Sequence, residues 1–234
     1  MNDYNTHDER LSKVVTDIQQ AFLTKVYGWM TLGLLVTAVT AIFFMTSGLI
    51  EVVFQSRITV LAVIFGQLGL VMYISARIAK MQPATAVLLF LLYSALTGMT
   101  FSIILSLYVP ESVASIFLTT AGMFAAMSAY GFITKRNLTG VGQFMMMGLI
   151  GVIIASVVNM FMGSADLSWI ISVLIVIIFT GLTAYDTQKL KNMAVEALDN
   201  SGISTQASIL GALMLYLDFI NLFLALLRLF GRRQ

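Results

Sequence analysis

Long apolar stretches, separated by short clusters of polar and charged residues, run along the whole chain. A transmembrane helix needs about 20 predominantly apolar residues to cross the hydrocarbon core of a bilayer. We therefore predict an all-α membrane protein with seven transmembrane helices, at about residues 26–46, 58–76, 84–109, 112–133, 141–162, 168–185 and 207–230. The polar stretch 187–206 is predicted to be the longest loop. A transmembrane barrel is excluded, because its strands would give short segments of alternating hydrophobicity instead.

The residues before the first apolar stretch follow a different pattern. Their apolar members recur at helical spacing with polar residues between them: Leu11, Val14, Val15, Ile18 and Phe22. This predicts an amphipathic helix on the membrane surface; the alternative is a solvated start of the first transmembrane helix. We accordingly divide the chain into a polar, amphipathic N-terminal segment, residues 1–25, and a single seven-helix domain, residues 26–234.

Composition supports this picture and limits the chemistry. The 234 residues are 59% hydrophobic and 10% charged, with a mean hydropathy of +0.94. The sequence has no cysteine, and its one histidine, His7, lies in the polar N-terminal segment. Thiolate and histidine-rich metal sites are therefore excluded. We expect no tightly bound cofactor, no metal catalysis and no nucleic-acid partner; the lipid bilayer is the expected surroundings.

The lysines and arginines of the loops predict the orientation in the membrane. Nine fall on the N-terminal side: Arg10, Lys13, Lys25, Arg77, Lys80, Lys135, Arg136, Lys189 and Lys191. Four fall on the opposite side: Arg57, Arg228, Arg232 and Arg233. This distribution predicts a cytosolic N-terminus. The C-terminal arginines oppose it, and a re-entrant last segment would remove the conflict, but we favour seven full spans.

Two aspartates lie inside the most apolar part of the chain, Asp186 in FTGLTAYDTQKL and Asp218 in LYLDFINLFLALLRLFG. A charge at the centre of a membrane helix costs about 2.5 to 3.5 kcal/mol on insertion scales, so such residues usually face a bundle interior and mark function. On the predicted topology both lie toward the cytosolic surface, with Asp218 about 9 Å deep at ~1.5 Å per residue. Their side chains meet if both face the interior.

Neighbouring carboxylates cannot both ionise without a large cost, so such a pair exchanges protons as a unit. This predicts a proton sensor. Carboxylates also suit Ca²⁺, but two are too few for tight binding, so we expect a transient cation site at Asp186 and Asp218. Arg77 is predicted at comparable depth. Its guanidinium either pairs with a carboxylate and latches the helices, or anchors the helix end by reaching the headgroups.

Small residues recur every four positions in the third apolar stretch, at Ser94, Gly98 and Ser102. Small residues let membrane helices approach closely. This stripe therefore predicts tight packing inside the bundle, rather than a dimer interface.

Four segments of the chain closely resemble the transmembrane Bax inhibitor motif family: VYGWMTLGLLVTA, YSALTGMT, LTAYDTQKL and LYLDFINLFLALLRLFG. The resemblance extends over residues 27–231. It implies six helices around a central seventh, a bacterial inner-membrane location, and a pH-sensitive calcium leak controlled by a di-aspartyl sensor. The sensor aspartates correspond to Asp186 and Asp218. The family's latching arginine corresponds to Arg77, although ARIAK is a loose match, and the segment between the aspartates is longer than in compact bacterial members.

Two functional hypotheses follow. The first is a calcium or cation leak channel gated by Asp186 and Asp218 with Arg77 as the latch. The second is a non-conducting regulator, since some bacterial relatives are thought to modulate a membrane-bound quality-control protease through a cytosolic tail, which here would be the polar stretch up to Gln20. We do not expect an enzyme: intramembrane aspartyl proteases carry their second aspartate in GLGD, whereas Asp218 stands in LDFI.

Overall fold

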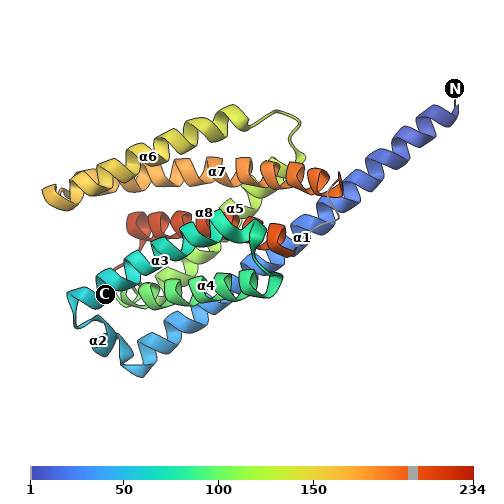
Figure 1. Cartoon of the computed structure of the whole chain (residues 1–234). Helices are drawn as coiled ribbons and strands as arrows, with labels where there is room; N and C mark the ends of the chain where they lie inside the picture. The colour runs from blue at the N-terminus through green and yellow to red at the C-terminus, as the bar shows by residue number, and fades with distance from the viewer. Residues whose placement is uncertain (1, 200–204) are drawn as a thin grey trace.

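The computed structural model describes residues 2–199 and 205–234, and within these ranges the chain is helical (Figure 1). The elements are α1 (Asn2–Ser47), α2 (Leu49–Phe54), α3 (Arg57–Arg77), the 3-10 turn η1 (Ile78–Lys80), α4 (Pro83–Leu105), α5 (Pro110–Ile133), α6 (Thr139–Met162), α7 (Ala165–Asp199) and α8 (Thr205–Phe230). In this described part of the chain, seven helices are long and apolar enough to cross a membrane. The predicted seven-helix architecture is confirmed.

The last helix, α8, lies in the interior of the bundle. In its most apolar stretch 72% of the residues are buried, against 6% in α3 and in α6. It packs against α1, α4, α5 and α7. The central position that the family resemblance implied for this helix is therefore confirmed, and the Ser208 and Asp218 side chains on α8 are buried in the bundle.

The first helix differs from the prediction. In the described part of the chain there is no separate surface helix: α1 runs without a break for 46 residues, and its N-terminal turns extend beyond the bundle (Figure 1). No glycine or proline lies between residues 11 and 27 to interrupt it. Phe22 and Val26 are fully buried, whereas Val14 is 53% exposed. The polar segment is thus the start of the first membrane helix, the alternative noted above.

The sixth membrane helix, α7, is longer than predicted. It continues to Asp199, so most of the expected loop 187–206 is helical. This stretch contains good helix formers and neither glycine nor proline up to residue 199. Leu190 and Ala194, four residues apart on one face, are fully buried. The prediction of a long loop was therefore wrong, because two apolar contacts outweigh the polar residues around them.

Close helix crossings rely on glycine. A Cβ atom at Gly98 of α4 would meet the carbonyl oxygen of Thr37 on α1, and a Cβ atom at Gly131 of α5 would meet the carbonyl oxygen of Ala184 on α7. Ser94 and Ser102, which flank Gly98 one turn away on either side, are fully buried. The small-residue stripe therefore packs inside the bundle, as predicted.

Candidate functional site

Asp186 on α7 and Asp218 on α8 come together inside the bundle. Their carboxyl groups lie within hydrogen-bonding reach of each other. Asp218 is only 4% exposed, and Asp186 is half-buried. An ionised carboxylate accepts hydrogen bonds but cannot donate one, so a bond between two carboxyl groups requires a proton on one of them. The structure thus brings the two predicted residues into an arrangement that can hold one shared proton.

One of the four carboxyl oxygens of the pair is buried without a hydrogen-bond partner among the described residues. Asp218 Oδ2 is buried and finds no N–H or hydroxyl donor among the described residues. Buried polar oxygens are nearly always paired, so an unmatched one indicates a site that takes up a proton, a water molecule or an ion. The positive charge that acts on Asp186 is that of Lys189, which is exposed one turn further along α7. Asp186 is therefore the wetter, and Asp218 the drier, member of the pair.

Arg77 is not part of this cluster. It is exposed in the last turn of α3. Among the described residues, the charged groups that act on the two aspartates are each other and Lys189. The next residues, Ile78–Lys80, pack against α8, and Gln206 near the start of α8 donates to the carbonyl oxygen of Met81 at 3.1 Å. The end of α3 is therefore tied to α8, while the Arg77 side chain occupies the position of an interfacial anchor; its role as a latch stays a prediction.

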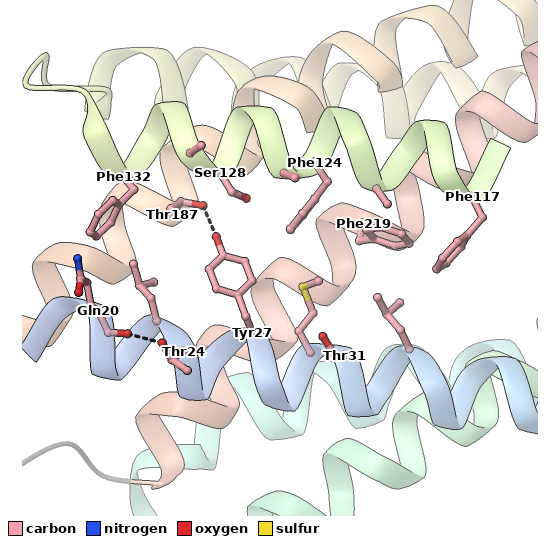
Figure 2. A pocket seen from close by; sticks show the side chains of 16 residues that line it. Gln20, Thr24, Tyr27, Thr31, Phe117, Phe124, Ser128, Phe132, Thr187 and Phe219 are labelled. Carbon is pink, nitrogen blue, oxygen red and sulfur yellow. Dashed lines mark hydrogen bonds between the residues drawn. The ribbon is translucent and has the colours of Figure 1, made fainter. Parts of the chain in front are cut away.

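A groove of about 820 Å³ opens between α1 and α5 beside the pair (Figure 2). Its floor includes Thr187 and Phe219, the residues that directly follow the two aspartates. Figure 2 shows Tyr27 of α1 reaching across it, with its hydroxyl group 3.3 Å from Thr187 Oγ1. Ser128 of α5 is buried in the wall, and its Oγ has no hydrogen-bond partner among the described residues. Polar groups thus connect this groove with the neighbourhood of the aspartates.

A buried hydroxyl cluster fixes α8 close to the pair. Tyr216, two residues before Asp218, places its hydroxyl 2.6 Å from Thr37 Oγ1 on α1, and that atom also donates to the Ser94 carbonyl oxygen on α4 at 3.0 Å. Three helices are joined by these two contacts. Sequence analysis missed both the groove and the cluster, because each combines residues from several helices and leaves no pattern within one segment.

The pair supplies two carboxyl groups to this part of the bundle. Among the described residues no group of three or more His, Cys, Asp or Glu side chains could hold a metal ion. Two carboxyl groups and nearby hydroxyls offer hard oxygen ligands, which Ca²⁺ prefers, but fewer than its usual six to eight.

Comparison with known proteins places the chain in a family. A family model described as inhibitor of apoptosis-promoting Bax1 matches residues 19–234. The chain belongs to the Bax inhibitor-1 family. The resemblance seen in the sequence is thereby confirmed.

Similar members of the family come from several bacteria. The inner membrane protein YbhL of Escherichia coli is 50% identical over 218 residues, which cover 92% of this chain and 93% of YbhL. An uncharacterized protein of Borreliella burgdorferi is 46% identical over 218 residues, covering 93% of this chain and 94% of that protein. Protein RP147 of Rickettsia prowazekii is 42% identical over 214 residues, covering 91% and 90%. With its seven apolar helices, the chain is a multi-pass inner-membrane protein.

Proposed function

We propose that this protein is a pH-sensitive cation leak channel, with Ca²⁺ as the cation, in which the aspartate pair is the proton sensor. The observation that carries the proposal is the buried contact between Asp186 and Asp218, with Oδ2 of Asp218 unmatched. When one proton is shared, the pair carries a single negative charge and joins α7 to α8. When that proton leaves, two negative charges adjoin in a medium of low dielectric, and a cation becomes the natural counter-charge.

The shared proton sets the direction in which cation flux responds to pH. Loss of the shared proton creates the cation site, so cation flux rises as the pH rises through the range in which the pair titrates. The pair titrates as a unit, so one transition in flux is expected over this range rather than two independent ones.

The helix best suited to move in response is α3. It packs mainly against α4, and little of it is buried. Gln67 holds it by donating to the Leu96 carbonyl oxygen at 2.6 Å and to Thr100 Oγ1 at 2.7 Å. Arg77 lies at the end of this helix, next to the η1 turn that contacts α8. In the proposed mechanism Arg77 pairs with an ionised aspartate in one state of the channel and is released in the other.

The orientation belongs to the same proposal. In this proposal the N-terminus lies in the cytosol, because nine of the thirteen lysines and arginines fall on its side of the predicted membrane. Seven full spans then bring the C-terminal end of α8 to the outer side. The aspartate pair and the polar end of the α1/α5 groove lie toward the cytosol. In this arrangement the protein transports and does not catalyse a reaction.

Calcium influx into liposomes tests the proposal. The purified protein is reconstituted with a Ca²⁺ dye inside, and influx is recorded between about pH 5 and 8, where coupled carboxyl groups can titrate. The wild type should show influx that rises with pH. The Asp186→Asn/Asp218→Asn variant should lose this pH dependence. Asp166→Asn, which removes an exposed acidic side chain at the start of α7, is the matched control and should behave as the wild type.

Two results would contradict the proposal. Influx no greater than that of empty liposomes at every pH would exclude a leak channel. An unchanged pH response in the double aspartate variant would exclude the pair as the sensor, even if the protein conducts.

The second candidate function is a non-conducting regulator of a membrane-bound protease. It is favoured by the N-terminal turns of α1, which extend beyond the bundle and offer a surface to a partner (Figure 1). If it is correct, removing residues 1–12 should change the degradation of the partner's substrates without altering calcium flux. In this case the aspartates serve only to lock α7 to α8.

A further inference from the structure

A second cavity, of about 760 Å³, lies at the end of the bundle where α8 finishes and α7 begins. Among the described residues that line it, the charged ones are Arg228 and Arg233. Four polar side chains share the wall with them: Ser156, Asn159, Ser168 and Ser172. Apolar residues continue it toward the bundle, among them Ile104, Ile171 and Leu229. We propose that this cavity binds an anionic phospholipid, with its phosphate on the two arginines and the start of its acyl chains on the apolar wall.

Arg233 is held in position by contacts within the protein. The backbone at Arg233 pairs with that of Tyr108, between α4 and α5. The Val109 N–H donates to the Arg232 carbonyl oxygen at 2.9 Å, and the Gln234 N–H donates to the Leu107 carbonyl oxygen at 3.1 Å. The guanidinium group of Arg233 lies over the Tyr108 ring, 5.9 Å from its centroid. A pre-positioned arginine loses less conformational entropy when it binds an anion.

Both charges in this cavity are guanidinium groups, which suit a phosphate. Guanidinium groups present several N–H donors in a planar fork that matches phosphate oxygens, and they bind phosphate more tightly than a neutral donor does. Arg228 stands in the last turn of α8, which places it near the end of a membrane span, where headgroups lie. Trp169, 61% exposed in the same wall, belongs to the residue type enriched at this depth. The position therefore fits a lipid headgroup.

Two serine hydroxyl groups in the wall favour one kind of headgroup. The hydroxyl groups of Ser156 and Ser172 donate to the carbonyl oxygens of Val152 and Ser168, at 2.7 and 2.9 Å. Their hydrogen atoms are therefore engaged, and their oxygens remain as acceptors. A headgroup that carries hydroxyl groups can donate to these oxygens. A phosphoglycerol headgroup supplies both the hydroxyl donors and a net negative charge, whereas a phosphocholine headgroup supplies neither.

The chain offers a matched control at the neighbouring arginine. Arg232 does not line the cavity. Its backbone N–H donates to Ser112 Oγ at 3.0 Å, so this residue contributes to the same local structure through its main chain. A general attraction of basic side chains to the membrane surface would involve all three arginines equally, whereas the proposed site requires only Arg228 and Arg233.

Native mass spectrometry of the full chain in mild detergent tests the site, with dioleoylphosphatidylglycerol as the probe and dioleoylphosphatidylcholine as the neutral reference. The wild type should bind phosphatidylglycerol in preference. Arg228→Gln/Arg233→Gln should weaken this binding by about tenfold or more, because it removes both charge-assisted contacts to the phosphate. Arg232→Gln should match the wild type. Ser156→Leu, which fills the cavity and keeps both arginines, should also lose the preference.

Three results would overturn the proposal. The first is equal binding of the two lipids by the wild type. The second is an equal loss in Arg232→Gln, which would indicate general surface charge. The third is complete displacement of the lipid by soluble glycerol phosphate, which would indicate a site for small anions rather than for a lipid. Because Ser156→Leu leaves every charge in place, a folding defect in the arginine variant would still leave one decisive comparison.

Discussion

Replacing Gly98 with alanine should destabilise the protein, because the crossing of α1 and α4 leaves no room for a methyl group. The new Cβ would meet the Thr37 carbonyl oxygen and would lie 3.1 Å from the Thr37 carbonyl carbon and 2.8 Å from Thr40 Cβ. None of these atoms lies at the end of a flexible side chain. The clash can therefore be relieved only by moving the two helices apart.

The size of the effect follows from two opposing contributions. Forcing an extra methyl group into a well-packed interior costs about 1 to 3 kcal/mol. Alanine's better helix propensity returns up to about 1 kcal/mol. Because the contact is with backbone, we expect a value near the upper end of the first range and a net loss of about 1 to 2 kcal/mol in the free energy of unfolding. Separation of the helices would also lengthen the contacts of Thr37 with Ser94 and Tyr216.

Thermal unfolding in detergent, followed by circular dichroism, measures this loss. Gly69→Ala is the matched control, because Gly69 is an exposed glycine on α3, and a Cβ atom added there would meet no other atom within 4 Å. This control should keep or raise the unfolding temperature, whereas Gly98→Ala should lower it. If Gly98→Ala unfolds at the same temperature as Gly69→Ala, the close crossing of α1 and α4 is refuted.

Three further predictions concern single contacts and the topology. Thr37→Val should lower the free energy of unfolding by about 1 to 3 kcal/mol, because it leaves the buried hydroxyl of Tyr216 without this partner. Thr37→Ser keeps the hydroxyl and should lower the free energy of unfolding by less; an equal decrease in the two variants would contradict a role for this hydrogen bond. Gln188 accepts from the Leu138 N–H and donates to the Arg136 carbonyl oxygen, both at 2.8 Å, and so ties the α5–α6 loop to α7. Gln188→Leu removes both hydrogen bonds and should speed tryptic cleavage of this loop about fivefold or more, since each bond contributes ~1 kcal/mol. Gln188→Glu keeps the acceptor and should give an intermediate rate. Since the chain has no cysteine, a single introduced cysteine is the only residue of this protein that a maleimide labels in intact cells. Ser56→Cys should react with a membrane-impermeant maleimide and Lys135→Cys should not, because the proposed orientation puts residue 56 outside and residue 135 in the cytosol. The reverse labelling pattern would show that the orientation is inverted.

The spans could be predicted from the sequence because hydropathy and length are properties of a single segment. The predicted ends of α1 and α7 were wrong, because contacts with other helices determine how far these two helices extend. The N-terminal turns of α1 are polar, but their apolar face ends in Phe22 and Val26, which are fully buried against other helices. Leu190 and Ala194 extend α7 in the same way through a stretch whose average composition resembles a loop. In both helices one buried residue per turn continues the helix through a polar stretch. The average hydropathy of such a stretch does not reveal these single positions.

In the candidate site, too, the properties of single segments could be predicted from the sequence, and those that depend on packing between helices could not. The depths of Asp186 and Asp218 followed from counting residues along two helices of opposite direction, and the structure brings them together. Counting does not give the rotation of a helix about its axis, which depends on what it packs against. The exposed position of Arg77 and the contact between Tyr27 and Thr187 both depend on such rotations. For this reason the pair could be predicted and its neighbours could not.

The rotation of α7 and α8 at the aspartates is fixed by contacts that leave little freedom. Gly131 of α5 lies against the backbone of Ala184, and Gly142 of α6 lies against the ring of Tyr185, where a Cβ would come within 2.5 Å. These two contacts hold α7 immediately before Asp186.

On the other side of the pair, the hydroxyl contact between Tyr216 and Thr37 holds α8 two residues before Asp218. Packed interiors are bistable rather than continuously deformable, so a change of charge inside such a clamp is transmitted to whichever neighbour is least tightly packed. In this bundle that neighbour is α3, which is mostly exposed and is linked to α8 through the η1 turn.

We therefore expect protonation of the pair to alter the position of α3 more than that of α7 or α8. Distances between spin labels on α3 and α5, measured at two pH values, should change, whereas those between α5 and α7 should not; a change confined to α7 would show that the glycine contacts do not clamp it.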